Sequence, residues 1–461
     1  MKMLKPFIFG AILGMLFPAC AQTINFTTIG SFDGTNGAQT RVGLVEGTNG
    51  NFYGLGYTGG TNGLGTVFEL APGGPVTNLY NFSGGTVSGD PYSPLLLGRD
   101  GFFYGEMLGG GVGYGYVFRM NHAGQLTTFA TFDGFIGYSP FGGLIQGQDG
   151  NFYGTCQQTG NYGSVFQITP AGTISNLFTF SGTANGSMPY AGLVQATNGV
   201  LYGTTYFGGT NGNYGTIFSI TTNRVFTSLF SFNKTNGANP SAPLVIGPDG
   251  NLYGTTRSGG TNAFNNSGTI FRITPGGQFT SLVSFGGVSP LGSGVYGGLV
   301  LGTNGLFYGM TYGGGTGYGG TIFQMDTNGN LTTLYSFSEN DSYVYADGNG
   351  PEDTLVQGTD GNFYGTTTSG GDYNKGTVFS FSLPPPPIAA PVFQSVSQTG
   401  GVVTFTWSAV SNASYQMQYN TNLSSANWLN LGGSVTASNT ILSASDFITN
   451  SSCFYRIELL Q

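Results

Sequence analysis

Hydrophobic and polar residues alternate in short runs throughout the chain, and one run recurs seven times. In each copy Phe or Leu is followed by Tyr and Gly, shortly after an Asn-Gly or Asp-Gly pair. The copies are 49 to 56 residues apart, and their tyrosines are Tyr53, Tyr104, Tyr153, Tyr202, Tyr253, Tyr308 and Tyr364. Self-similarity at such a period is typical of a repeat architecture.

Each repeat contains four runs that are typical of short β-strands. In the first repeat these runs are residues 43–47, the strand around Tyr53, residues 65–68 and residues 77–82. The Asx-Gly pair between the first two runs favours a type I′ hairpin, because both residues accept a positive φ. The third run carries a phenylalanine in every copy: Phe68, Phe118, Phe166, Phe218, Phe271, Phe323 and Phe379. Four antiparallel strands in such a unit indicate the blade of a β-propeller.

The repeats predict an all-β fold, a seven-bladed β-propeller closed by its N-terminal strand. After residue 40 the first three runs occur seven times, but the fourth occurs only six times. Residues 27–32 (Thr-Thr-Ile-Gly-Ser-Phe) supply the missing copy, since they closely resemble residues 332–337 (Thr-Thr-Leu-Tyr-Ser-Phe). We therefore expect this strand to complete the last blade, which removes the unpaired edge of an open array.

Residues 1–21 have the features of a secretory signal peptide. Lys2 and Lys5 precede an apolar run, and small residues at 19 and 21 form a cleavage site near Ala21. Simple cleavage is the favoured interpretation, and lipidation of Cys20 is the alternative. The mature chain is then expected to be secreted or held at the cell surface.

The rest of the chain is expected to form two domains joined by a spacer. Residues 22–382 hold the propeller repeats, and residues 383–391 are a proline-rich, semi-rigid linker. Residues 392–461 alternate around Trp407 and predict a small β-sandwich similar to fibronectin type III. No later run is apolar enough to predict a transmembrane segment in the mature chain.

The composition of the chain narrows the classes of molecule that the protein is expected to bind. Only 7% of the residues are charged and the formal net charge is −8, so a nucleic-acid partner is not expected. Cys156 and Cys453 alone follow residue 21, and two cysteines give no disulfide framework. A polysaccharide and a surface protein remain as the partner classes that we consider.

The repeat resembles the GloVer tandem repeat of exported, choice-of-anchor bacterial proteins. The similarity is carried by residues 247–256 (Gly-Pro-Asp-Gly-Asn-Leu-Tyr-Gly-Thr-Thr), 268–277 and 280–285, and it covers residues 27–381. It implies a secreted or surface-associated bacterial repeat protein. The family offers no catalytic residues that could be transferred to this chain.

The candidate ligand-binding residues lie in the longer connections, which emerge on one face of a propeller. Rigid scaffolds commonly carry binding residues on variable loops. Aromatic rings among Asn, Thr and Gly offer stacking surfaces for a glycan, whereas the alternative is that they pack loop against loop. The predicted set is Tyr57, Tyr92, Tyr138, Tyr206, Tyr312, Tyr373, Arg41 and Arg257.

An acidic connection before the last repeat is a candidate Ca²⁺ site. It contains Glu339, Asp341, Asp347, Glu352 and Asp353. Ca²⁺ takes six to eight oxygen ligands, but the spacing fits no EF-hand, so a solvated acidic loop is the favoured interpretation. No organic cofactor is expected.

These observations predict a non-catalytic exported propeller for binding or cell-surface interaction, and we assign no catalytic residues. The first alternative is a carbohydrate-active hydrolase or lyase that uses carboxylates on the loop face, with Glu106 and Asp372 as candidates. The second alternative is a purely structural envelope protein. Catalysis would require two or more carboxylates to converge in one central pocket.

Overall fold

The computed structural model describes residues 24–84, 91–110, 113–160, 162–261, 267–286, 291–338, 345–384, 390–422, 427–447 and 453–460. The expected signal peptide, residues 1–21, lies outside these ranges. The chain divides into two compact units, Met1–Pro384 and Pro385–Gln461. Every regular element in the described residues is a β-strand, which confirms the all-β prediction. No helix in these ranges could cross a membrane.

The first unit is built from seven antiparallel sheets among its described residues. In chain order, the first sheet contains β2 (Val45–Glu46), β3 (Phe52–Gly56), β4 (Thr66–Leu70) and β5 (Val76–Asn81); the second contains β6 (Leu96–Leu97), β7 (Phe103–Met107), β8 (Tyr116–Met120) and β9 (Leu126–Thr131); and the third contains β10 (Tyr138–Pro140), β11 (Ile145–Gln146), β12 (Phe152–Gln158), β13 (Ser164–Ile168) and β14 (Ile174–Thr179). The fourth contains β15 (Val194–Gln195), β16 (Leu201–Thr205), β17 (Thr216–Ile220) and β18 (Phe226–Ser231); the fifth contains β19 (Val245–Ile246), β20 (Leu252–Thr256), β21 (Thr269–Ile273) and β22 (Phe279–Ser284); and the sixth contains β23 (Val300–Leu301), β24 (Phe307–Thr311), β25 (Tyr318–Met325) and β26 (Leu331–Ser338). The last sheet contains β27 (Val356–Gln357), β28 (Phe363–Thr366) and β29 (Thr377–Ser382), together with β1 (Asn25–Ser31).

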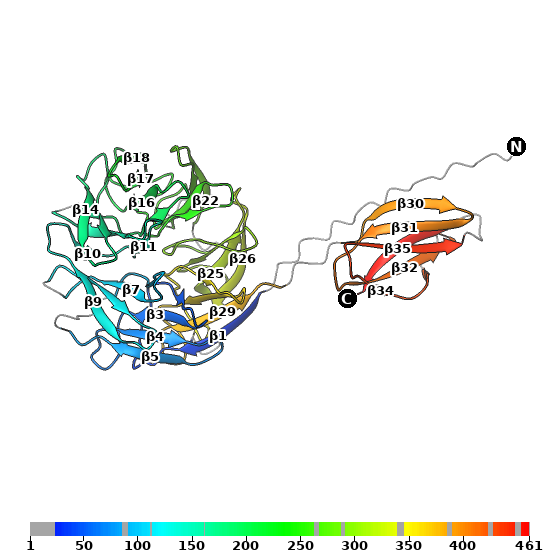
Figure 1. Cartoon of the computed structure of the whole chain (residues 1–461), viewed down its shortest axis with the longest axis horizontal. Helices are drawn as coiled ribbons and strands as arrows, with labels where there is room; N and C mark the ends of the chain where they lie inside the picture. Colours follow the sequence, from blue (N-terminus) through cyan, green and yellow to red (C-terminus); the bar gives the residue numbers. More distant parts are fainter. Residues whose placement is uncertain are drawn as a thin grey trace. The chain divides into compact units, whose positions relative to one another are not determined.

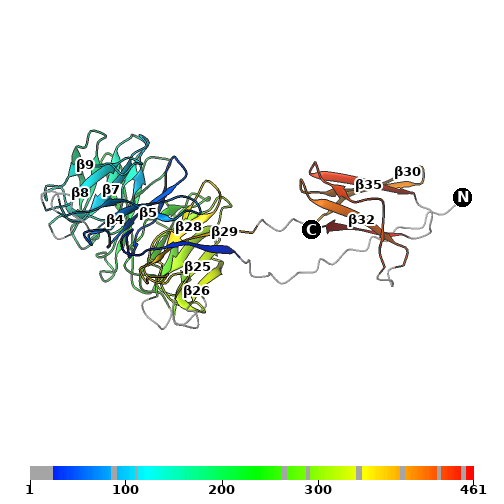
Figure 2. The same ribbon diagram turned by 90° about the horizontal axis from the view of Figure 1, so that it is seen from below.

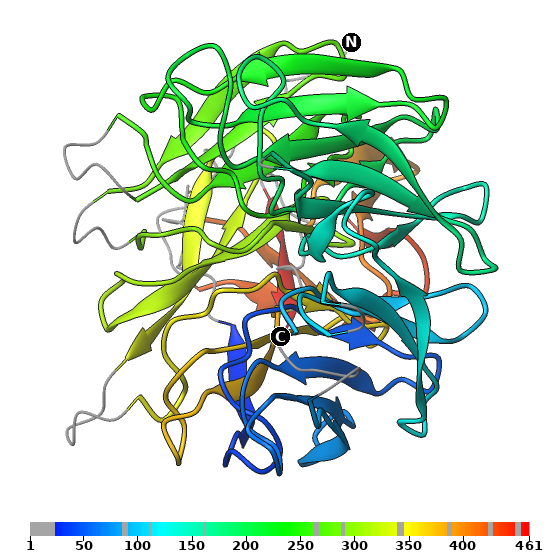
Figure 3. The same cartoon turned by 90° about the vertical axis from the view of Figure 1, so that its left-hand side faces the viewer.

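The sheets follow one another around a common centre in sequence order, a β-propeller-like arrangement (Figure 1). The side view in Figure 3 shows neighbouring sheets lying face to face. The hydrophobic core is divided among the gaps between these sheets. One cluster, for example, joins Tyr153 and Val165 of the third sheet to Leu201, Phe218 and Ile220 of the fourth.

The repeated Phe-Tyr-Gly run forms the second strand of each sheet. Phe52 and Tyr53 of β3 are both buried, because side chains on opposite faces of a strand each meet a neighbouring sheet. A buried tyrosine needs a hydrogen-bond partner, and the preceding turn supplies one. The Tyr hydroxyl donates to the turn carboxylate at 2.7 Å in Tyr104–Asp100, Tyr153–Asp149 and Tyr364–Asp360, and at 2.8 Å in Tyr253–Asp249.

The N-terminal strand pairs with the last strand of the first unit. β1 is antiparallel to β29, with Phe26 opposite Phe381. The Phe26 ring stacks on Tyr335 of β26 with ring centroids 4.0 Å apart. Phe32, just after β1, lies in a core cluster with Phe52 of the first sheet and Tyr364 of the last. β1 therefore brings the two ends of the repeat array into contact.

The second unit is a pair of small antiparallel sheets. One has the order β30 (Phe393–Thr399), β31 (Val402–Ser408), β35 (Ile441–Phe447), and the other groups β33 (Leu429–Asn430), β34 (Val435–Thr436) and β36 (Phe454–Leu460) around β32 (Ser414–Asn420). Figure 2 shows β30 and β35 in one layer and β32 in the other. Trp407, Tyr415 and Met417 are buried between the layers.

Candidate functional site

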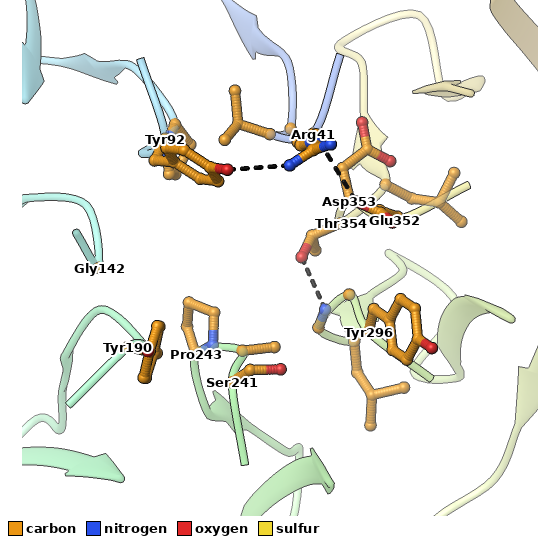
Figure 4. Close-up of a pocket in the computed structure, with 18 of the residues that line it drawn as sticks. Arg41, Tyr92, Gly142, Tyr190, Ser241, Pro243, Tyr296, Glu352, Asp353 and Thr354 are labelled. Carbon is orange, nitrogen blue, oxygen red and sulfur yellow. Dashed lines mark hydrogen bonds and ion pairs between the residues drawn. The ribbon is translucent and has the colours of Figure 1, made fainter. Parts of the chain in front are cut away.

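A cavity of about 890 Å³ lies at the centre of the first unit, lined by residues from all seven repeats. Each repeat places one side chain at an equivalent position, three residues before a buried leucine. We call these side chains the inner ring (Figure 4). In chain order they are Arg41, Tyr92, Phe141, Tyr190, Ser241, Tyr296 and Glu352.

Close backbone packing at the centre fixes the position of the inner ring. The leucine three residues later, such as Leu193 at 2% exposure, is held in the core between sheets. Residues between the ring position and the leucine are small in most repeats. A Cβ added at Gly142 would lie 2.5 Å from the backbone of Ala191, so adjacent repeats meet too closely there for a side chain. The ring side chains consequently point away from this contact and line the cavity.

Three consecutive repeats give the cavity an aromatic wall, which consists of Tyr92, Phe141 and Tyr190. Tyr92 and Phe141 are stacked with ring centroids 5.0 Å apart, and Phe141 meets Tyr190 edge-on at 4.8 Å. Tyr57 and Tyr206 extend this chain of rings, each 4.7 Å from its neighbour in the wall. Contacts of this kind fix the rings and leave an amphipathic surface for a ligand.

Three of the remaining repeats supply a charged wall, which we define as Arg41, Arg257, Glu352 and Asp353. Arg41 donates a hydrogen bond from Nη1 to the Tyr92 hydroxyl at 2.9 Å, and its Nε lies 3.9 Å from Glu352 Oε2. The guanidinium group of Arg257 lies over the ring of Tyr296, 4.2 Å from its centroid. Tyr296 is itself stacked on Tyr312 at 5.1 Å.

The acids of the charged wall sit in different electrostatic settings. Burial raises the pKa of Glu352, whereas Arg41 and Arg257 act in the opposite direction. Burial raises the pKa of Asp353 to about 8, although the Thr366 hydroxyl donates a 2.6 Å hydrogen bond to its Oδ2. The other oxygen, Oδ1, is buried without a hydrogen-bond partner among the described residues. Burial therefore favours the protonated form of Asp353, and both arginines lie near the Glu352 carboxyl group.

The structure separates the predicted ligand-binding residues into three groups. Arg41, Tyr92 and Arg257 line the cavity directly. A second group packs behind the ring: Tyr57, Tyr206 and Tyr312. Two residues are not among those that line the cavity, namely Tyr138, whose hydroxyl donates to the Gly160 carbonyl at 3.1 Å, and Tyr373, which is 60% exposed.

Four residues that line the cavity are missing from the predicted set of ligand-binding residues, namely Phe141, Tyr190, Ser241 and Tyr296. The prediction drew mainly on the longest connections, whereas these residues, like Arg41 and Tyr92 of the predicted set, stand just before the first strand of their repeats. A signal was present in the sequence. Aligning the repeats on the leucine of the first strand places all inner-ring residues in one column.

Three of the five acidic residues proposed as Ca²⁺ ligands, Asp347, Glu352 and Asp353, belong to the part of the chain that the structure describes. Glu339 and Asp341 lie outside it. Asp347 accepts a 2.8 Å hydrogen bond from the Tyr335 hydroxyl, while Glu352 and Asp353 line the cavity. Within the described ranges no group of three or more His, Cys, Asp or Glu side chains could hold a metal ion.

The two carboxylates considered for catalysis are not among the residues that line the cavity. Glu106 is buried, and its Oε2 accepts a hydrogen bond from the Gly143 amide at 2.9 Å. Asp372 lies in the connection between β28 and β29, where its amide donates to the Ser31 hydroxyl. Cys156 is buried and Cys453 is partly exposed, and both are free thiols.

Comparison with solved structures gave matches at low sequence identity. A chain described as the extracellular domain of the hybrid two component system BT3049 from B. thetaiotaomicron is 12% identical, with a TM-score of 0.50, over 93% of this chain and 56% of that chain. The gluconolactonase XC5397 from Xanthomonas campestris is 12% identical (TM-score 0.40, 79% of this chain and 92% of that chain). The periplasmic gluconolactonase PpgL of Pseudomonas aeruginosa is 14% identical (TM-score 0.43, 72% and 99%). Such similarities concern the fold alone.

A search of curated proteins gave no match. A family model, described as the Gloeobacter/Verrucomicrobia repeat, matches residues 11–162 and 143–379. These two matches together span most of the chain and nearly all of its repeats. The chain therefore belongs to the Gloeobacter/Verrucomicrobia repeat family.

Proposed function

We propose that this protein is an exported, non-catalytic binding protein that holds a glycan in the central cavity of its first unit. The observation that carries this proposal is the inner ring, where equivalent positions of successive repeats place aromatic and charged side chains around one cavity. Ligand sites are concave, largely pre-formed and rich in aromatic residues with a few polar groups. The cavity of about 890 Å³ has these properties.

The proposed scaffold is a seven-bladed propeller closed by the N-terminal strand. It is supported by the pairing of β1 with β29 and by the core cluster that joins Phe32 and Phe52 to Tyr364. A closed ring leaves no open sheet edge between first and last repeats, which is how propellers limit edge-to-edge association. A closed ring would also keep the inner-ring residues at fixed mutual distances.

A glycan suits the cavity better than a purely apolar ligand. The aromatic wall offers ring faces that can stack against the apolar face of a sugar, while Arg41, Ser241 and Glu352 supply hydrogen-bonding groups. Tyr92 combines both, because its ring faces Phe141 and its hydroxyl accepts from Arg41.

The remaining parts of the chain fit a role outside the cytoplasm. Residues 1–21 have the features of a cleaved signal peptide, and the family match begins within them. We propose that the mature protein is secreted or held at the cell surface after cleavage near Ala21. The second unit would act as a fibronectin type III-like accessory or attachment module, supported by the buried Trp407 between its two sheets.

Glycan binding can be tested with an array of plant, algal and bacterial oligosaccharides, followed by calorimetry on each positive probe. Tyr190→Ala should weaken binding about tenfold, because this ring forms one end of the aromatic wall. Phe135→Ala is the matched control, since that ring is 89% exposed and does not line the cavity. If no oligosaccharide binds, or if Tyr190→Ala leaves binding unchanged, the proposal is wrong.

A carbohydrate-active enzyme is the alternative, and one observation favours it. Glu352 and Asp353 both line the cavity, and burial raises the pKa of Asp353 to about 8, which favours its protonated form at neutral pH. A protonated acid beside an ionised one is the arrangement that glycosidases use. Turnover of chromogenic glycosides that is lost in both Glu352→Gln and Asp353→Asn would establish this alternative and overturn the binding proposal.

A further inference from the structure

The central cavity contains an arginine, Arg257, that forms no ion pair with the residues that the structure describes. Arg41 is already engaged by the Tyr92 hydroxyl and by Glu352. Arg257 lies over the Tyr296 ring and forms no ion pair with any residue that the structure describes. Because Arg257 is exposed to the cavity rather than buried, its charge needs no internal partner and remains available to a ligand.

The charge balance of the cavity favours an anion. Arg41 and Arg257 both lie close enough to Glu352 to act on the ionisation of its carboxyl group, so the two guanidinium groups share one carboxylate. Burial disfavours ionisation of Asp353, the other acid that lines the cavity, so positive charge predominates there in a protein whose formal net charge is −8. A negatively charged ligand would restore neutrality in a concave, partly desolvated site, where charge pairing is stronger than at an open surface.

The arrangement also restricts the shape of that anion. The guanidinium carbon of Arg257 lies 4.2 Å from the centre of the Tyr296 ring, and a guanidinium group is planar, with N–H donors spaced to make two parallel hydrogen bonds. A planar carboxylate matches this geometry. Arg257 lies close enough to Tyr206 to act on the ionisation of its hydroxyl, and the Tyr206 ring is 4.7 Å from Tyr190 of the aromatic wall, so one ring-shaped ligand can meet both features.

We propose that the cavity recognises an acidic sugar, with the carboxylate of a uronic acid residue bound by Arg257 and its sugar ring stacked on the aromatic wall. This inference rests on the proposed glycan-binding function. Arg41, which pairs with Glu352 and Tyr92, adds a second positive charge, while the Tyr296 ring contacts the Arg257 guanidinium group. Neutral sugars of the same size lack the group that Arg257 holds and bind more weakly.

The inference is tested by calorimetry on the full chain with oligomers of galacturonate, glucuronate, mannuronate and guluronate, each paired with its neutral methyl ester. At least one uronate should bind ten or more times more tightly than its ester, and raising the NaCl concentration should reduce that preference. A sulfated neutral oligosaccharide forms a third arm. Binding of this probe in preference to every uronate would overturn the carboxylate assignment.

Three variants distinguish loss of carboxylate recognition by Arg257 from a general loss of structure. Arg257→Gln should reduce uronate affinity about tenfold and change methyl-ester affinity less than twofold, whereas Arg257→Lys should restore part of the preference. Arg224→Gln removes the same charge from an exposed turn between β17 and β18 and should change neither affinity. An equal loss for both probes in Arg257→Gln would overturn the inference.

The two proposals fail in different ways. If neutral oligosaccharides bind through Tyr190 and uronates bind no more tightly than their esters, the acidic-sugar inference is wrong and the glycan-binding function stands. If no oligosaccharide binds, charged or neutral, both are wrong.

Discussion

Glu106→Gln should stabilise the protein increasingly as the pH rises. Glu106 is fully buried on β7, where its Oε2 accepts from the Gly143 amide and its Oε1 has no partner among the described residues. Burial raises the pKa of this carboxyl from 4.5 to about 8. Glutamine has nearly the same shape, keeps an oxygen for the Gly143 amide and carries no ionisable group. The substitution therefore removes the titration while retaining the packing.

The size of the effect follows from linkage between proton binding and folding. In the unfolded chain Glu106 ionises near pH 4.5, whereas in the folded protein it stays protonated up to about pH 8. Between these values unfolding releases a proton, so the free energy of unfolding falls by about 1.4 kcal/mol for each pH unit of increase. At pH 7 the wild type has lost about 3 kcal/mol through this group. The loss levels off above pH 8, and it is absent below pH 4.5.

Urea unfolding of the first unit, followed by the fluorescence of its tyrosines at pH 4.5, 5.5, 6.5 and 7.5, measures this effect; both tryptophans lie in the second unit and report on that unit instead. The stability of Glu106→Gln should match that of the wild type at pH 4.5 and exceed it by about 3 kcal/mol near pH 7. Asp133→Asn is the control, because Asp133 is exposed and the asparagine keeps the oxygen that accepts from the Phe135 amide. A difference that does not grow with pH, or a variant less stable than the wild type at pH 7, would refute the reasoning.

Three further outcomes are expected. Gly203→Ala should destabilise the protein by about 1–3 kcal/mol in urea unfolding, because the new Cβ would lie 2.6 Å from Phe218 Cζ; Gly276→Ala, with no atom nearer than 3.8 Å, should have no such effect. Phe26→Ala should cost about 2 kcal/mol through loss of its stacking on Tyr335, while the exposed Phe135→Ala should be neutral in the same assay. Uronate affinity measured by calorimetry should fall between pH 7 and pH 9 as Asp353 ionises beside Glu352, and Asp353→Asn should abolish that fall.

The repeat pattern was sufficient to predict the strands because the same local chemistry recurs in every copy. The Asp149-Gly150 pair forms a turn, and the Asp149 carboxylate accepts a hydrogen bond from the hydroxyl of Tyr153 on the next strand. Packing between sheets explains why Phe152 and Tyr153 are both apolar in character, a pattern that alternation alone would not predict. The pairing of β1 with β29 could be anticipated because residues 27–32 repeat the sequence of residues 332–337.

The cavity was harder to predict because its lining depends on how close the backbones approach at the centre. Loop length directed attention to Tyr138 and Tyr373, which are not among the lining residues. The close backbone contact between Gly142 and Ala191 places Phe141 and Tyr190 at the cavity. This contact joins two repeats, so it cannot be predicted from the local sequence of either one. The two arginines could be identified as candidates, but their relation to one carboxylate required the fold.

Differences between equivalent positions separate the requirements of the fold from those of a site. The strand position that Glu106 fills in the second repeat is occupied by a threonine in four other repeats, Thr155, Thr204, Thr255 and Thr366. A neutral side chain therefore satisfies the packing at this position. The same holds for Asp353, since Ser93, Ala191 and Ala242 occupy its position in other repeats. Each acid therefore carries a burial cost that the propeller does not impose, and such departures from local consistency are expected at functional sites. Of the two acids only Asp353 lines the cavity, beside the ion pair of Glu352 and Arg41. The proposed binding function would account for its burial cost, and Glu106 should be replaceable without loss of binding.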